Sequence, residues 1–108
     1  MSNTNYVVLG STGKELIRLE NVLHPGYLIE MESESRGFKK QDIAMKLGIK
    51  PQHLSELIHE KRNVSALLAL KLEQVFGIDA EYWLRVQSGF DLALARKKLS
   101  DLNATIAA

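Results

Sequence analysis

Polar side chains that can donate or accept hydrogen bonds are concentrated in the segment 50–62 of this chain. Its apolar residues Leu54, Leu57 and Ile58 recur at the spacing of one helix face, so the polar residues between them face outward. This outward set consists of Gln52, His53, Ser55, Glu56 and His59. A glutamine can pair with adenine through two hydrogen bonds, a lysine such as Lys50 can donate to guanine, and a glutamate can accept from cytosine. The alternative is an ordinary solvated helix face.

A second helical pattern immediately before this segment would position it. Ile43, Ala44 and Leu47 give the segment 39–47 one apolar face. Gly48 tolerates the left-handed backbone at which a helix stops, and Pro51 suits the first position of the next helix. Two short helices joined by a tight turn form a helix-turn-helix pattern, in which the second helix enters the DNA major groove. The pattern predicts a DNA-binding core.

The charge of the chain favours the same region. The net charge is only +1, which by itself would not indicate a nucleic-acid partner. Residues 36–62, however, hold seven Lys and Arg against three Asp and Glu, whereas residues 1–35 hold two against five. A basic excess over the helix-turn-helix is what contact with phosphates requires. On charge alone, a solvated charged surface is the other interpretation.

Length and composition indicate one globular domain. A chain of 108 residues with 45% apolar and 25% charged residues can bury a single core. The lack of cysteine excludes disulfides and thiolate chemistry. No apolar run approaches the roughly 18 residues of a membrane span, and the N-terminus lacks a signal-peptide pattern. We therefore expect a cytoplasmic protein without a membrane partner.

Three further helices are predicted around the helix-turn-helix. One follows the His-Pro-Gly sequence at 24–26 and ends near residues 35–37. The next covers 66–76, between a cap at 63–65 and a glycine. The last covers 80 to about 99 and is followed by a fraying tail. It carries apolar residues at i, i+3, i+7 and i+11, namely Trp83, Val86, Phe90 and Leu94. The expected fold class is all-α, with five helices.

The first 23 residues form the least regular part of the sequence. A β-prone run at 6–9 precedes a glycine-rich stretch at 10–13. Thr12 and Glu15 match a capping box followed by leucines at helical spacing, which favours a helix, although a hairpin also fits. The arm is either a local extension packed on its own domain or a partner-binding segment. We expect three parts: an N-terminal arm at 1–23, a DNA-binding and dimerisation domain at 24–99, and a C-terminal tail at 100–108.

Patterns that would support catalysis or metal binding are missing from the sequence. His53 and His59 are six residues apart and fall on different sectors of a helix, and His24 adds no metal-binding spacing. The alternating glutamates at 30–34 cannot all share one helix face. No nucleophile motif, phosphate-binding glycine loop or zinc-protease motif is present. We therefore expect no enzyme, no cofactor and no metal.

The order of several short motifs resembles one known family. Residues 38–62 and the helix after them are similar to the Xre/Cro–repressor type of helix-turn-helix. The flanking motifs follow the order of HigA-type antitoxins: His24-Pro25-Gly26, Ile43-Ala44, Leu47-Gly48, Leu54-Ser55-Glu56-Leu57, Lys61-Arg62, Phe76-Gly77, Tyr82-Trp83-Leu84 and Asp91-Leu92-Ala93. The resemblance covers about residues 24–98 and leaves the arm outside it.

This resemblance implies a lambda-repressor-like fold and a bacterial antitoxin. Such proteins form homodimers, bind a palindromic operator ahead of their own operon, and hold a cognate mRNA-cleaving toxin inactive. The implied base-facing residues are Lys50, Gln52, His53 and Glu56. The implied phosphate-facing residues are Lys39, Lys40, His59, Lys61 and Arg62. The expected dimer face of the last helix carries Val86, Phe90 and Leu94, whereas Trp83 is expected in the monomer core.

The sequence departs from the family pattern at four positions. Lys39 and Lys40 replace the usual capping Ser or Thr and the Gln after it, so a helix cap is lost. Lys50 replaces the Ser or Thr that opens the recognition helix, and Glu60 replaces the glycine that follows it. Together with Glu56, Glu60 adds negative charge beside the expected phosphate path. Two alternatives therefore stay open: a stand-alone Xre-type repressor, and a protein-binding module with weak or no DNA affinity.

Overall fold

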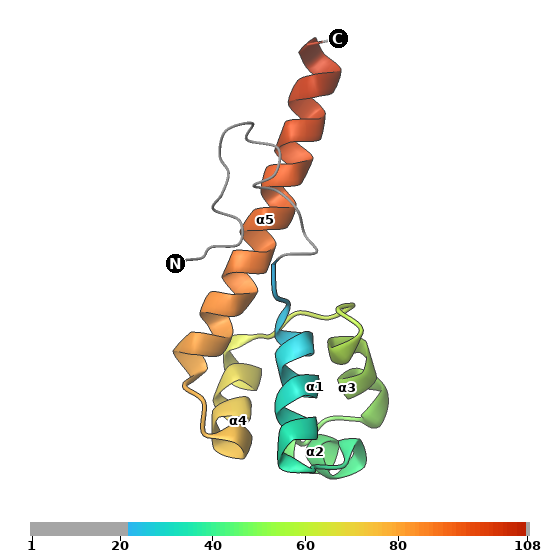
Figure 1. Cartoon of the computed structure of the whole chain (residues 1–108), viewed down its shortest axis with the longest axis vertical. Coiled ribbons are helices and arrows are strands. Elements are labelled where there is room, and N and C mark those ends of the chain that lie inside the picture. The colour runs from blue at the N-terminus through green and yellow to red at the C-terminus, as the bar shows by residue number, and fades with distance from the viewer. Residues whose placement is uncertain (1–21, 108) are drawn as a thin grey trace. The chain divides into compact units, whose positions relative to one another are not determined.

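A computed structural model describes residues 22–107, and this part of the chain is all-α (Figure 1). Its five helices are α1 (Pro25–Arg36), α2 (Lys40–Leu47), α3 (Pro51–Ile58), α4 (Ala66–Phe76) and α5 (Ala80–Ala107). The predicted fold class is thereby confirmed. The helix or hairpin expected before residue 22 lies outside the described residues. None of the described helices is long and apolar enough to cross a membrane.

The described residues belong to two compact units. One unit is His24–Gln87, which holds α1 to α4 and the first turns of α5, and the remainder of α5 from Ser88 belongs to the other. In the first unit, α3 packs against α1 and α2, and α2 also packs against α4. Its largest fully buried side chains are Trp83, Ile29, Ile43, Leu47, Leu54, Leu57 and Leu72. Trp83 Nε1 donates to the Ile78 carbonyl at 3.1 Å, so this tryptophan is part of the monomer core, as predicted.

The His-Pro-Gly sequence fixes how α1 meets α3. His24 is the N-cap, and its Nδ1 accepts a hydrogen bond from the Gly26 amide at 2.9 Å. Pro25 occupies the first helical position, where no amide proton is needed. A Cβ atom at Gly26 would lie only 1.7 Å from the carbonyl oxygen of Leu57. Glycine therefore lets the start of α1 contact the backbone of α3 directly.

Side chains from α4 and α5 hold the segments on either side of α4. The Ser65 hydroxyl accepts from the Leu68 amide at 3.2 Å, which confirms the predicted cap. The buried Gln87 carbonyl oxygen accepts from the Val64 amide at 2.7 Å and ties the segment after α3 to α5. Glu73 Oε1 accepts from the Ala80 amide at 3.1 Å, so α4 supplies an acceptor for the start of α5. α5 itself continues to Ala107, well beyond the end expected near Leu99.

Candidate nucleic-acid interface

The predicted helix-turn-helix is formed by α2, the turn at Gly48 and α3. Gly48 has a φ of +68°, and the amide after it, that of Ile49, donates to the Ala44 carbonyl at 3.0 Å. This left-handed turn ends α2 and directs the chain into α3, which begins at Pro51. Leu57 is fully buried against the core. The opposite face of α3 is therefore turned to solvent.

The four residues predicted to face bases lie on this outer surface. Lys50, at the N-cap, and Gln52 are exposed, whereas His53 and Glu56 are partly buried. All four line one surface depression together with Gly48, Ile49 and Arg62. The structure thus brings the predicted base-facing residues together, and it adds Arg62 from the loop after α3.

Glu56 lies at the centre of the polar contacts on this surface. Its Oε1 is 2.5 Å from Arg62 Nε, and its Oε2 is 3.4 Å from Gln52 Nε2. The hydrogen bond from Arg62 is the main reason why the pKa of Glu56 is lowered, and the Gln52 amide adds to the effect. Glu56 therefore carries its negative charge at neutral pH, next to a positive partner.

His53 has a lowered pKa on the same surface. Desolvation is the largest cause, followed by the positive charge of Arg62, whereas the negative charge of Glu56 acts in the opposite direction. The imidazole is therefore neutral at neutral pH. A neutral ring has one donor and one acceptor nitrogen, so His53 can either donate to or accept from a base edge.

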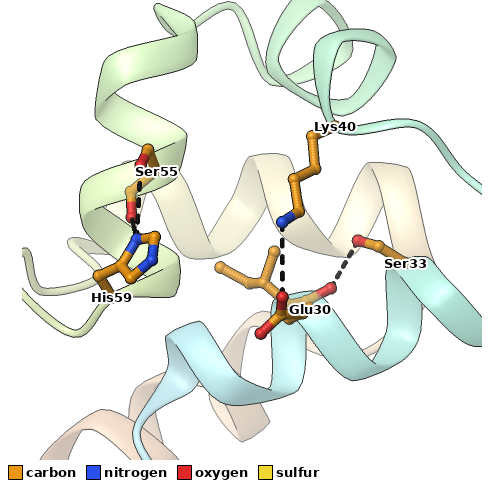
Figure 2. Close-up of polar contacts among 6 residues, drawn as sticks. Glu30, Ser33, Lys40, Ser55 and His59 are labelled. Atoms are coloured by element: carbon orange, nitrogen blue, oxygen red, sulfur yellow. Dashed lines mark hydrogen bonds and ion pairs between the residues drawn. The ribbon is translucent and has the colours of Figure 1, made fainter.

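The residues predicted to face phosphates have different contacts in this structure. Lys40 Nζ lies 3.4 Å from Glu30 Oε2 of α1, and Figure 2 shows the two side chains directed toward one another. In the same figure, His59 turns back to Ser55, where its Nδ1 donates to the backbone carbonyl at 2.7 Å. Lys39 and Lys61 are exposed and form no ion pair with any residue that the structure describes. Lys39 also provides no side-chain cap for α2, as its sequence position predicts.

Glu60 occupies the backbone position where glycine is usual. Its φ is +63°, and it is the only non-glycine residue with positive φ in the described part of the chain. The Glu60 amide donates to the Leu57 carbonyl at 3.0 Å, and the Lys61 amide donates to the Glu56 carbonyl at 2.8 Å. These two bonds form a Schellman motif, which closes α3 and turns the chain back over it. Glu60 therefore holds a left-handed backbone conformation that is strained for a residue with a Cβ atom.

The residues predicted for the dimer face are partly accessible. Val86 is partly buried and packs against the core of its own unit. Phe90 and Leu94 are also partly buried. Surface on α5 is more exposed at Leu92, Leu99, Leu102 and Ile106, whose exposed fractions lie between 52% and 73%.

Two features of the site were missed by the sequence reasoning. The contact between Arg62 and Glu56 spans six positions and depends on the loop conformation, so no helical spacing indicates it. Gln87 holds the segment after α3 through its hydrogen bond to Val64. The burial of Gln87 could have been predicted from the sequence. This residue follows Trp83 by four residues and therefore falls on the buried face of α5.

The chain matches a known family of helix-turn-helix proteins. The family described as helix-turn-helix matches residues 30–83, half of the chain. The chain therefore belongs to this DNA-binding helix-turn-helix family, and the resemblance to its Xre-type members is confirmed. Virulence-associated protein A′ of Dichelobacter nodosus is 35% identical over 85 residues, which cover 78% of this chain and 74% of that protein.

Solved structures place the chain beside bacterial antitoxins. Antitoxin GraA is 31% identical with a TM-score of 0.69, and the match covers 77% of this chain and 90% of GraA. Antitoxin HigA of Pseudomonas aeruginosa, solved with the higBA promoter, is 25% identical with a TM-score of 0.69 and coverages of 74% and 88%. The protein is therefore antitoxin-like and, as a member of a non-enzymatic family, is not an enzyme.

Proposed function

We propose that this protein is an antitoxin that binds operator DNA as a homodimer, represses its own operon and neutralises a cognate mRNA-cleaving toxin. The observation that carries the DNA-binding half is the outer surface of α3, where Lys50, Gln52, His53 and Glu56 lie together. The similarity to GraA and to HigA, which was solved with promoter DNA, supports the proposal. Its place of action would be the cytoplasm, where bacterial DNA lies.

In this proposal, α3 enters the major groove and reads base edges. Gln52 pairs with adenine, Lys50 donates to guanine, and Glu56 accepts from the amino group of cytosine. His53 adds a neutral donor or acceptor beside them. These contacts provide sequence preference, because each base pair presents a distinct pattern of donors and acceptors in the major groove.

The phosphate contacts fix the register of the protein on the duplex. Lys39 and Lys61 have no ion pair to break among the described residues and are available at once. Lys40 first has to leave Glu30, an exposed pair that costs little to separate. His59, at the C-terminal end of α3, and Arg62, in the loop after it, complete the predicted set. Such contacts raise affinity for all sequences alike.

The dimer is proposed to form through α5. A two-fold pair places two recognition helices about 34 Å apart, one turn of DNA, so that each reads one half-site. Val86, Phe90 and Leu94 are the residues predicted for this contact. The exposed apolar residues later in α5, Leu92, Leu99, Leu102 and Ile106, lie on the other side of the helix and form an alternative contact surface.

The test of DNA binding is a gel-shift titration with duplex DNA from directly upstream of the gene, at two salt concentrations. We expect a specific shift, and we expect the logarithm of the binding constant to fall linearly with the logarithm of the salt concentration. Gln52→Ala should lose discrimination at one or two base pairs, by about 1–3 kcal/mol. Lys40→Gln should instead weaken binding to all duplexes alike.

Either of two results would contradict this assignment. If Gln52→Ala changes neither specificity nor affinity, α3 is not the recognition helix. If a folded dimer gives no shift at micromolar concentration, the helix-turn-helix is a protein-binding scaffold. The negative charges at Glu56 and Glu60 are the observation that favours that second function.

The toxin half requires a separate test. A neighbouring gene for a small basic protein would distinguish an antitoxin from a stand-alone repressor. Co-expression of that neighbour with this protein should restore growth that the neighbour alone arrests. Growth arrest that persists on co-expression would contradict the antitoxin role and leave a repressor that does not neutralise this neighbour.

A further inference from the structure

The loop after α3 is folded back onto the recognition surface. The Schellman motif at Glu60 reverses the chain, so that Arg62 lies over the outer face of α3. Arg62 Nε is 2.5 Å from Glu56 Oε1, and about half of the Arg62 side chain remains exposed. Arg62 also lines the same depression as the predicted base-facing residues. Arg62 therefore contacts the surface that is predicted to face bases, and not only the phosphate-facing region beside it.

Glu56 links Arg62 to Gln52. Its two oxygens have different partners, Arg62 at Oε1 and Gln52 at Oε2. The three side chains therefore form a chain of contacts from the loop to the N-terminal turn of α3. Gln52 and Glu56 are four residues apart on one helix face, so the orientation of one constrains that of the other.

The chain of contacts determines which groups face a base pair. Gln52 turns its Nε2 toward Glu56, which leaves one N–H and the carbonyl oxygen for the two-point contact with adenine. A bidentate contact requires the amide in one of its two orientations. If the amide is oriented before binding, less conformational freedom is lost when the complex forms.

We propose, on the basis of the DNA-binding function above, that Arg62 is a positioning residue that sets the base preference of α3 through Glu56 and Gln52. Its main role is then not the phosphate contact that its sequence position predicts. Lys61 provides the matched comparison, because it is adjacent, basic and exposed but has no ion pair among the described residues. The two neighbours should therefore differ in their effect on base preference.

The experiment compares variants on the upstream duplex and on duplexes with single base-pair substitutions. Arg62→Lys keeps the charge but loses the guanidinium geometry. It should reduce the preference at the base pairs read by Gln52 and Glu56 by about tenfold, while the slope of log K against log salt stays unchanged. Lys61→Gln should weaken all duplexes alike and reduce that slope by about one. Thermal melting of each variant confirms that it is folded.

A double-mutant cycle separates positioning from general destabilisation. In a Glu56→Gln background, Arg62→Lys should have little further effect on base preference, because the carboxylate that it positions is gone. If Arg62→Lys keeps the base profile of the wild type, or has the same effect with and without Glu56, the inference is overturned. Wild-type protein that binds no duplex specifically overturns the proposed function as well. The two failures are therefore distinguishable.

Discussion

Glu56 places a carboxylate on the surface proposed to face DNA, where an uncompensated negative charge would oppose binding. Arg62 offsets that charge through a short ion pair in the free protein. Glu60 has no such partner among the described residues. Of the two glutamates that raised doubt about DNA affinity, Glu60 is therefore the stronger source of repulsion.

The titration of two residues should report the Arg62 contact directly. Glu56 is expected to have a lowered pKa in the wild type, and Arg62→Gln should raise the pKa because the main favourable partner of the carboxylate is removed. The pKa of His53 should also rise, since Arg62 contributes to lowering it. NMR titration of the glutamate carboxyl carbon and the imidazole protons measures both.

The control for these titrations is Lys61→Gln, which removes a neighbouring positive charge without touching Glu56. It should leave both pKa values close to those of the wild type. The sign for stability also follows: a carboxylate with a lowered pKa stabilises the fold above the ordinary glutamate pKa, and this contribution is lost as the pH falls through the lowered value. An unchanged Glu56 titration in Arg62→Gln would mean that the ion pair does not persist in solution.

The elements of the site differ in how their ends are stabilised. α4 has a serine cap, and α1 has the imidazole of His24, whereas α2 has no side-chain cap at Lys39. At the other end, α2 stops at a glycine, but α3 stops with Glu60 in the left-handed region. The proposed recognition helix, α3, is therefore closed by a strained residue, and strain of this kind costs roughly 1–2 kcal/mol for an L-residue.

Glu60→Gly should consequently stabilise the protein. Relief of the left-handed strain is partly offset by the greater freedom of glycine in the unfolded chain, roughly 0.4–1 kcal/mol, so a net gain of about 0.5–1 kcal/mol is expected. Denaturant unfolding measures the change. Glu60→Gln is the control, because it removes the charge but keeps the Cβ atom and therefore the backbone strain. An equal gain in both variants would assign the effect to charge and contradict the backbone explanation.

At the scale of the whole molecule, the helix order and the outward face of α3 were predictable from local signals. Glycines marked helix ends, Pro51 marked the start of α3, and the spacing of Leu54 and Leu57 identified the face that is buried. The end of α5 was placed too early. Neither a glycine nor a proline stands between 99 and 107, so no local signal marks a helix end there and α5 continues to Ala107. The Arg62–Glu56 pair was not predictable, since it depends on the backbone at Glu60 rather than on spacing.

The longer α5 matters for assembly, because it carries apolar side chains that are more than half exposed. Leu92, Leu99, Leu102 and Ile106 are separated by seven, three and four residues, the spacing of a helix–helix seam. At 3.6 residues per turn, this stripe lies on the opposite side of the helix from Phe90 and Leu94. Since Phe90 and Leu94 are already partly buried, the exposed stripe has more surface to offer a second copy.

We therefore expect Leu99→Lys combined with Leu102→Lys to dissociate the proposed dimer. Burying one leucine is worth about 1.5–3 kcal/mol, so the loss of two should raise the dissociation constant at least about a hundredfold. Light scattering across a concentration series measures it. Ala104→Lys adds one positive charge, half of that in the double variant, on the exposed opposite side and should leave the proposed dimer intact. If only Leu94→Lys separates the protomers, the contact lies instead on the face predicted from the sequence. In either case, operator affinity should fall in parallel with dimerisation, because a single recognition helix reads only one half-site.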